Sequence, residues 1–341
     1  MGFPASFSIS GRSVGAGAPC LIIAEAGVNH FGDIEKAFRL VDMAVDAGAD
    51  VLKIQHFYTD RMIGNSAVEW QDRMRGKELT EDSIHRIKEY CEYRGILFLC
   101  TPHDDWALRF LDQELNLPAF KIGSGEVENW PFLAQVARCG KPIILSTGMY
   151  RMDQIHEAVR VLADNGCPAL AILHCVTSYP AQPAAINLKV MDEIQSFFSG
   201  PVGYSDHTAG TTVPLAAVAR GAAVIEKHIT LERDVPNAQD WKVSCDPSNF
   251  SNFVDQAREI EIALGQRQKS IGDQEQKSLL WARKSLHAAK AIPAGNRIEA
   301  SMLVAKRPGN GISPIHVESI IGRTIRHDIP ADIMIDWDMI I

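Results

Sequence analysis

Short apolar runs rich in Val, Ile and Leu recur along most of the chain and alternate with amphipathic segments. Eight such runs begin at Cys20, Asp50, Ile96, Ala119, Pro142, Leu170, Pro201 and Ala222. The runs are continuous and do not alternate strictly between apolar and polar residues. This pattern is typical of parallel strands that are buried on both faces.

The segments between these runs have the periodicity of helices packed on a sheet. In IEKAFRLVDMAVDAG (34–48), apolar residues recur on one helical face, while Asp33 suits the N-cap and Gly48 the end of the helix. The segment 152–166 repeats this pattern. Eight strand–helix units over about 265 residues predict a (β/α)8 TIM barrel rather than an open doubly wound sheet. No GxGxxG motif opens a helix after the first run, which counts against a dinucleotide-binding fold.

The sequence changes in character after the last predicted barrel helix, which spans 247–264. A polar, charged stretch follows, and from Ser285 onward the chain consists of short β-like pieces separated by turns. We therefore predict a barrel domain at 1–268, a linker at 269–284 and a small β-rich domain at 285–341. A domain of this size buries little apolar surface by itself, so we expect it to dock on another surface.

Composition and charge narrow the classes of protein that fit. The 341 residues carry a net charge of -8, which argues against a dominant nucleic-acid-binding surface and requires local basic residues for any anionic ligand. The N-terminus lacks the basic and apolar regions of a signal peptide, and no apolar run approaches membrane-spanning length. The seven cysteines are scattered, and three lie in strand-like runs, where reduced thiols are expected. We expect a cytoplasmic protein with no nucleic-acid or membrane partner.

Polar side chains mark the end of every predicted strand. In a barrel of this kind, the loops that follow the strands are held by a rigid scaffold and carry the functional residues. In chain order, the polar residues at these ends are Glu25, Asn29, His30, Lys53, Gln55, His56, Thr101, His103, Lys121, Ser124, Ser146, Thr147, His174, Ser205, Asp206, His207, Glu226, Lys227 and His228. We expect them to converge on one site.

Two lysines at the ends of the second and fourth strands indicate an anion site. Lys53 and Lys121 each bring a compact charge with three donors, and neighbouring hydroxyls can complete the shell around a small dianion such as phosphate. The alternative is structural, because either lysine could reach solvent or pair with Glu25 or Glu226.

Two histidines end the seventh and eighth strands, which are neighbours in a closed barrel. His207 and His228 can therefore face one point. Two neutral imidazoles, with water and a substrate oxygen, would form an open site for Mn²⁺, Mg²⁺ or a similar ion, which could polarise a carbonyl group as a Lewis acid. The alternative is that each histidine is structural.

Several motifs in order along the chain resemble one enzyme family. The motifs are IIAEAGVNHFGD, AGADVLKIQ, KIGSGE, ILSTGM, YSDHT, IEKHIT and KRPGNGISP. Together they closely resemble the sialic acid synthase family, N-acetylneuraminate synthase-like nonulosonate synthases that condense phosphoenolpyruvate with an acylated amino-hexose. The segment from Ser285 resembles the antifreeze-like SAF (β-clip) domain that ends members of this family.

The resemblance implies roles for the residues at the strand ends. His207 and His228 would hold the divalent metal ion, most commonly Mn²⁺ with Mg²⁺ or Co²⁺ as alternatives, and would act in catalysis together with Glu25 and Glu226. The residues implied to bind phosphoenolpyruvate are Lys53, Thr101, Lys121, Ser124, Ser146 and Ser205. Those implied to contact the sugar are Glu25, Tyr179, Asp240 and Arg307. Arg307 would come from the partner subunit of a homodimer that exchanges its C-terminal domains.

One loop departs from the motif of this family. After EKHITLERD, relatives that make N-acetylneuraminate carry a GPDH-like run, whereas this chain has VPNAQDWKVSCDP. Asp240 would take the place of the acidic sugar-contacting residue, Trp241 would add bulk, and Thr177 stands where some relatives have asparagine. The loop Asn237–Cys245 therefore leaves the sugar open between N-acetylmannosamine and a 2,4-diacetamido-trideoxyhexose of the legionaminate or pseudaminate type. The alternative is that the loop has changed without consequence.

Two alternative functions from other classes of protein are also considered. A class I aldolase would use Lys53 or Lys121 to form a Schiff base and would need no metal ion. A non-enzymatic protein would use the C-terminal domain to bind carbohydrate or ice, with the barrel as a scaffold. The second reading leaves the polar strand ends without a role.

Overall fold

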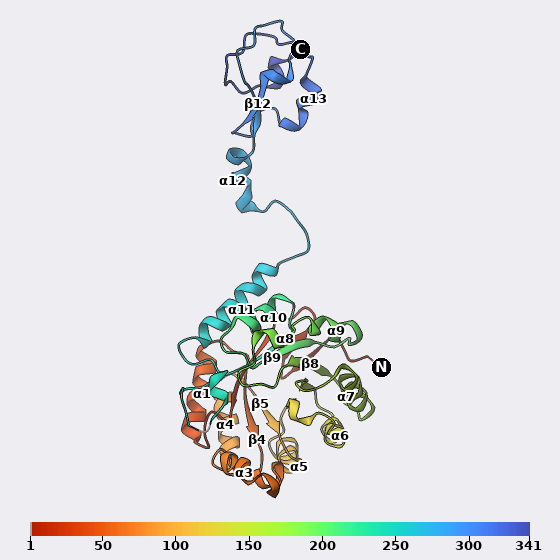
Figure 1. Ribbon diagram of the computed structural model, residues 1–341, viewed down its shortest axis with the longest axis vertical. Coiled ribbons are helices and arrows are strands. Elements are labelled where there is room, and N and C mark those ends of the chain that lie inside the picture. Colours follow the sequence, from red (N-terminus) through yellow and green to blue (C-terminus); the bar gives the residue numbers. More distant parts are fainter. Residues whose placement is uncertain (1, 237) are drawn as a thin grey trace. The chain divides into compact units, whose positions relative to one another are not determined.

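The computed structural model describes residues 2–236 and 238–341. The chain divides into two compact units, Met1–Gly265 and Gln266–Ile341 (Figure 1). No helix within the described ranges is both long enough and apolar enough to cross a membrane.

The first unit is built on eight parallel strands, one for each apolar run of the sequence. They are β3 (Leu21–Gly27), β4 (Val51–His56), β5 (Leu97–Pro102), β6 (Phe120–Ile122), β7 (Ile143–Ser146), β8 (Leu170–Cys175), β9 (Val202–Asp206) and β10 (Val224–His228). Their hydrogen-bonded order is β5-β4-β3-β10-β9-β8-β7-β6, and β5 and β6 at its two ends pack side by side. The sheet therefore curls into a barrel, and the predicted TIM barrel is confirmed.

Helices lie outside this barrel (Figure 1). They are α1 (Ile34–Asp46), α2 (Thr59–Met62), α3 (Val68–Arg75), α4 (Glu81–Arg94), α5 (Asp105–Arg109), α6 (Trp130–Arg138), α7 (Met152–Asp164), α8 (Pro183–Ile186), α9 (Val190–Phe197), α10 (Thr212–Ala219) and α11 (Phe250–Leu264). Asp33 caps α1 as predicted, because its carboxylate accepts hydrogen bonds from the backbone N–H groups of Glu35 at 2.9 Å and Lys36 at 3.3 Å. Gly48, at φ +75°, takes the left-handed conformation just after the helix.

A hairpin that the apolar pattern did not reveal closes the end of the barrel where the strands begin. Strands β1 (Ser6–Ile9) and β2 (Arg12–Gly15) pair in antiparallel fashion. Ile9 and Val14 are buried and join the apolar cluster inside the barrel. The other buried residues of that cluster lie in the barrel strands or, for Ala119, directly before one: Leu21, Ile23, Val51, Leu99, Ala119, Ile144, Ala171, Leu173 and Val224. Solvent is thereby kept from one end of the barrel, and the polar side chains occupy the other end.

A buried ion pair ties β9 to β10 on the side of the barrel wall away from the cavity. Lys227 Nζ lies 2.6 Å from Asp206 Oδ2 and donates a second hydrogen bond, of 2.8 Å, to the carbonyl oxygen of Thr208. The Tyr204 hydroxyl donates to the other Asp206 oxygen at 2.9 Å. Both charged side chains are 0% exposed. Because successive strand residues point to opposite faces, this pair fixes the strand positions that direct His207 and His228 toward the opposite side.

The second unit is a small domain with its own apolar core. It contains α12 (Asp273–Ala282), the antiparallel strands β11 (Ser285–Ala288) and β12 (Leu303–Lys306), and α13 (Val317–Ile320). Its core consists largely of isoleucines, together with Leu286 and Ala288. The segment 269–284, predicted from its polar composition as a linker, contains helix α12, none of whose residues is buried.

The hairpin makes a measurable contribution to the core. We expect Ile9→Ala to lower the free energy of unfolding by about 2–5 kcal/mol, because Ile9 is 1% exposed and its loss leaves a cavity inside the barrel. Urea unfolding followed by circular dichroism checks this, with Ser8→Ala on the exposed face of the same strand as the control. Equal stability of the two variants would contradict the hairpin's role in the core.

Breaking the Asp206–Lys227 pair should be costly. Lys227→Met leaves a buried carboxylate without its cation, and we expect a loss of about 3–5 kcal/mol of unfolding free energy in the same assay. The double variant Asp206→Asn, Lys227→Met removes both charges and should recover part of that loss. A single variant that is as stable as the wild-type protein would show that the pair does not hold the two strands.

Candidate active site

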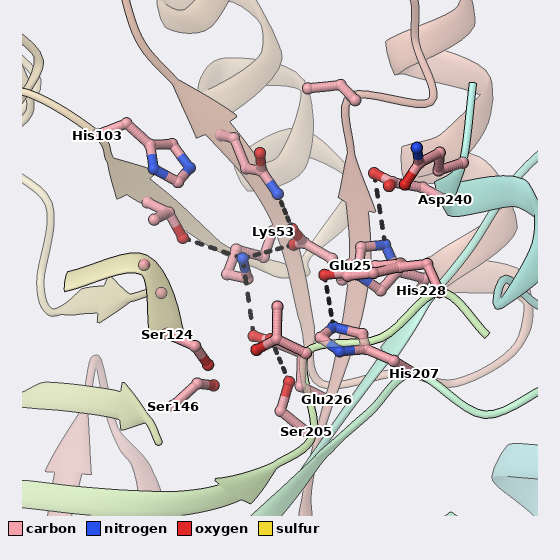
Figure 2. A pocket seen from close by; sticks show the side chains of 18 of the residues that line it. Glu25, Lys53, His103, Ser124, Ser146, Ser205, His207, Glu226, His228 and Asp240 are labelled. Atoms are coloured by element: carbon pink, nitrogen blue, oxygen red, sulfur yellow. Dashed lines mark hydrogen bonds and ion pairs between the residues drawn. The ribbon is translucent and has the colours of Figure 1, made fainter. Parts of the chain in front are cut away.

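A cavity of about 310 Å³ opens where the barrel strands end, and every strand supplies at least one lining side chain or a residue that directly follows it (Figure 2). Fifteen of the side chains that the sequence analysis singled out line it: Glu25, Lys53, Gln55, Thr101, His103, Lys121, Ser124, Ser146, Thr177, Tyr179, Ser205, His207, Glu226, His228 and Asp240. The structure therefore brings them to one place.

Not every polar strand end reaches this cavity, and here the expectation of convergence was too broad. Asn29, His30, His56, Thr147, His174, Asp206 and Lys227 are absent from its lining. His174, for example, bonds through Nε2 to the carbonyl oxygen of Ile186 at 2.6 Å. The alternation of side chains along a strand explains the division, because neighbouring residues point to opposite sides of the wall. Arg307 belongs to the second unit, where its guanidinium lies 5.1 Å from the centre of the Trp281 ring.

Lys53 occupies the centre of the cavity floor (Figure 2). Its Nζ atom lies 2.7 Å from Glu25 Oε2 and 3.7 Å from Glu226 Oε2, and it donates a 3.0 Å hydrogen bond to Thr101 Oγ1. Burial alone would lower the pKa of Lys53, but the Glu226 and Glu25 carboxylates outweigh burial and raise it above its ordinary value. Lys53 is therefore a cation at neutral pH.

Lys121 lies near the other oxygen of the Glu226 carboxylate. Its Nζ donates to Ser146 Oγ at 2.7 Å and lies 3.4 Å from Glu226 Oε1, which also accepts a 2.9 Å hydrogen bond from Ser205. Burial lowers the pKa of Lys121, with Glu226 opposing. The pKa of Glu226 lies below its ordinary value, because Lys121 and Lys53 together outweigh the effect of burial.

The two lysines are thus both paired with glutamates and exposed to the cavity. The structural alternative considered for them, pairing with Glu25 or Glu226, occurs, but it does not remove them from the site, because all four side chains line the same space. Burial raises the pKa of Glu25 despite its contact with Lys53. Two ammonium groups beside the hydroxyls of Thr101 and the nearby serines can therefore accept an anion with several oxygens.

The two histidines face each other across the other side of the cavity (Figure 2). Their ring centres lie 5.3 Å apart at an interplanar angle of 49°. His207 Nδ1 lies 2.9 Å from the Val176 carbonyl oxygen, which fixes the proton on that nitrogen, and Nε2 faces the Tyr179 hydroxyl at 2.9 Å. His228 Nδ1 is buried without a hydrogen-bond partner among the described residues and lies 3.9 Å from Asp240 Oδ2.

This pair fits a metal ion that keeps part of its water shell. Burial holds the pKa of His228 well below its usual range, so its ring is neutral and can act as a ligand. Burial alone would lower the pKa of His207, but Cys175 and the Val176 carbonyl oxygen outweigh burial and raise it, so this ring would release a proton on binding an ion. Within the described part of the chain, no group of three or more His, Cys, Asp and Glu side chains is placed to hold a metal ion. The protein would therefore supply two imidazoles, and water or substrate oxygens the remaining positions, as in an open catalytic site rather than a closed structural one.

Gly27 allows three side chains to approach at the cavity wall. It sits at a bulge in β3 with φ +54°. A Cβ atom there would lie 3.2 Å from Asp240 Oδ2, 3.4 Å from Glu25 Oε1 and 3.4 Å from His228 Cε1. Both the backbone conformation and the crowding therefore favour glycine.

The loop that departs from the family motif contributes to the cavity through Gln239 and Asp240. Asn237 lies outside the described residues. Trp241 was expected to add bulk beside the sugar, but it is absent from the cavity lining and donates its indole N–H to the Val235 carbonyl oxygen at 3.2 Å. Thr177 does line the cavity.

One segment at the cavity was missed by the sequence analysis. Trp70, Arg73, Met74 and Lys77, on and just after α3, line the cavity. Their spacing places them on one helical face, and this was the signal that could have revealed them. The helix is short and polar, and it lies between strands rather than at a strand end, so nothing in the apolar pattern pointed to it.

Comparison with known proteins places the chain among carbohydrate-synthesising enzymes. The model of the NeuB family matches residues 40–269, and that of the SAF domain matches residues 283–341. The chain is 39% identical to N,N'-diacetyllegionaminic acid synthase of Campylobacter jejuni, over 89% of this chain and 95% of that protein. It is 35% identical to human N-acetylneuraminate-9-phosphate synthase, over 92% and 91% of the two chains.

Solved structures agree with this assignment. The crystal structure of N-acetylneuraminic acid (sialic acid) synthetase from Leptospira borgpetersenii, in complex with citrate, superposes with a TM-score of 0.76 at 32% identity. The match covers 82% of this chain and 96% of that one. The chain therefore belongs to the NeuB family, the sialic acid synthase family, and carries a C-terminal SAF domain.

Proposed function

We propose that this enzyme is a nonulosonic acid synthase. It condenses phosphoenolpyruvate with the open-chain aldehyde of an N-acetylated amino-hexose, and phosphate is released by C–O cleavage. The observation that carries the proposal is a single cavity that joins a two-lysine anion site to a facing pair of imidazoles. Relatives named as legionaminic, pseudaminic and sialic acid synthases support the same chemistry.

The anion site would hold phosphoenolpyruvate. Lys53 and Lys121 neutralise its phosphate and carboxylate, and the hydroxyls of Thr101, Ser124, Ser146 and Ser205 offer hydrogen bonds around it. The carboxylates that pair with these lysines favour their charged forms. Because the donors are already fixed by Glu226 and Ser146 contacts, little reorganisation is needed when the anion arrives.

The aldehyde group of the sugar would lie at the two facing imidazoles. His207 and His228 would bind a divalent ion, Mn²⁺ with Mg²⁺ or Co²⁺ as alternatives, and such an ion polarises a carbonyl oxygen as a Lewis acid. Tyr179 packs against both rings, and its hydroxyl lies 2.9 Å from His207 Nε2, the nitrogen that would bind the ion, so this hydroxyl would give way to the ion. Glu25, kept in place by Gln55 at 2.9 Å, and Asp240 present carboxyl oxygens to sugar hydroxyls.

The proposed reaction proceeds between the two reactants held side by side in the cavity. C3 of phosphoenolpyruvate forms a bond to the aldehyde carbon, whose oxygen takes a proton. Water adds at C2 and loses a proton, and the C2–O bond breaks with its electron pair leaving on phosphate. Neither reactant needs a protein nucleophile, so orientation and electrostatic stabilisation supply most of the rate.

The class I aldolase alternative finds less support. Burial lowers the pKa of Lys121, as a Schiff-base lysine requires, but its Nζ is engaged by Ser146 and Glu226, and Lys53 is held by Glu25. Borohydride should therefore fail to trap any substrate on the protein, and a covalent adduct on either lysine would reverse this choice.

The sugar substrate is proposed to be one of two, N-acetylmannosamine or a 2,4-diacetamido-trideoxyhexose. A panel of these sugars with phosphoenolpyruvate and Mn²⁺, scored by phosphate release and product mass, distinguishes them. Reaction with none would place the enzyme outside this substrate set.

The metal proposal predicts a specific loss. His207→Ala or His228→Ala should abolish measurable turnover and the protein's binding of Mn²⁺, followed by the electron paramagnetic resonance of the free ion. His174→Ala is the matched control, since His174 also ends a strand but lies outside the cavity lining. Full activity of chelator-treated wild-type protein would contradict metal dependence.

We also propose a homodimer in which Arg307 acts in the partner's cavity. Arg307→Ala should then be inactive alone, yet mixing it with inactive His207→Ala protein should restore about a quarter of wild-type activity after subunit exchange, because half the dimers are mixed and each contains one intact site. Absence of recovery in a mixture shown to exchange subunits would place Arg307 in its own barrel's site or outside catalysis.

A further inference from the structure

His103 is a cavity side chain with no role in the reaction described above. It follows β5 directly, two residues after Thr101, and lines the cavity together with Lys53 and Lys121. Figure 2 shows it on the same side of the cavity as Ser124 and Ser146, apart from the two facing histidines.

The ring is held in place by packing, while its Nε2 atom is left without a partner among the described residues. Its backbone N–H donates to the His56 carbonyl oxygen at 3.1 Å, and the ring packs edge-on against Phe57, with centres 6.3 Å apart. Nε2 is buried and has no hydrogen-bond partner among the described residues. A buried polar atom with no partner costs free energy, and such an atom in a cavity wall indicates a ligand contact.

The charges around His103 favour an anionic ligand. Lys53 from β4 and Lys121 from β6 are the cations that face it, and His56 adds a third titratable group from β4. Burial, followed by the charges of these lysines, lowers the pKa of His103 to about 4. At neutral pH the ring is thus a neutral donor in the same cavity lining as the two lysines, where it adds no repulsion and an anion would be attracted.

The segment Gly123–Gly125 lies beside the ring in the cavity wall. A Cβ atom at Gly123 would lie 3.8 Å from His103 Cε1, and Gly123, Ser124 and Gly125 all line the cavity. Of the two anionic groups of phosphoenolpyruvate, the phosphate carries more charge and more acceptor oxygens. It therefore suits the part of the cavity where the two lysines, the hydroxyls and His103 meet.

We propose that His103 is a phosphate-binding residue of this enzyme, and that a ring nitrogen donates a hydrogen bond to the phosphate of phosphoenolpyruvate. This rests on the proposed function for the identity of the anion. The hydrogen bond adds to the Lys53 and Lys121 contacts and persists with inorganic phosphate after C–O cleavage, so the same residue contacts both the substrate and the released product.

Two variants separate hydrogen bonding from packing. His103→Phe keeps a flat ring against Phe57 but has no donor, whereas His103→Gln keeps a neutral donor. Calorimetric titration of the full-length protein with phosphoenolpyruvate and with inorganic phosphate should show affinity for both lowered about tenfold in His103→Phe. His103→Gln should recover part of this loss, and KM for the sugar should stay unchanged in both.

Each outcome decides between specific claims. Wild-type affinity in His103→Phe would overturn the role of His103 while leaving the proposed function intact. Equal losses in His103→Phe and His103→Gln, accompanied by lower thermal stability, would assign the ring a structural role instead. Failure of the wild-type protein itself to bind phosphoenolpyruvate or phosphate would overturn the proposed function and this inference with it.

Discussion

The site depends on mutual compensation of buried charges at one end of the barrel. Lys53 and Lys121 are each about 2% exposed, and a lone ammonium group in such a place would lose its proton or destabilise the fold. Glu226 lies within reach of both, and Glu25 contacts Lys53 at 2.7 Å. The carboxylates therefore permit the cations to exist inside the barrel, and the cations keep Glu226 ionised. An anion bound here as proposed would meet charges that are already in place.

The barrel makes that compensation possible because each strand sends alternate side chains to opposite sides. Glu226 and His228 point to the cavity, while Lys227 between them pairs with Asp206 on the other side of the wall. The neighbouring Ser205 and His207 follow the same division. A one-residue shift of β10 against β9 would exchange the two sets, so the buried Asp206–Lys227 pair opposes any slip that would turn Glu226 and His228 away from the cavity. Structural and functional charges thus occupy adjacent positions of the same strands.

The apolar pattern predicted the barrel because buried parallel strands leave a strong local signal, and the motifs predicted most of the lining because functional residues follow strand ends. The hairpin with Ile9 and Val14 escaped because its strands are short and mostly exposed, and its burial arises only from packing on the finished barrel. The exact register of each strand also decides which of its last residues face the cavity. It turns Glu226 toward the cavity and Lys227 away from it. Helix α12 lies in a stretch whose polar composition resembles a linker, because none of its residues is buried.

The division between strands and loops also accounts for how one barrel can serve several sugars. The charged and imidazole groups that would carry the chemistry stand on strands or directly after them, where the sheet holds them within a narrow geometry. Tyr179, Thr177 and Asp240, and the Trp70–Lys77 face, come from connecting segments and complete the lining of the cavity. Segments of this kind tolerate substitution because they bear little of the core. Relatives that are 32–39% identical to this chain carry names for different nonulosonic acids, as expected if the strand-borne groups are constrained by the reaction and the loops by the sugar.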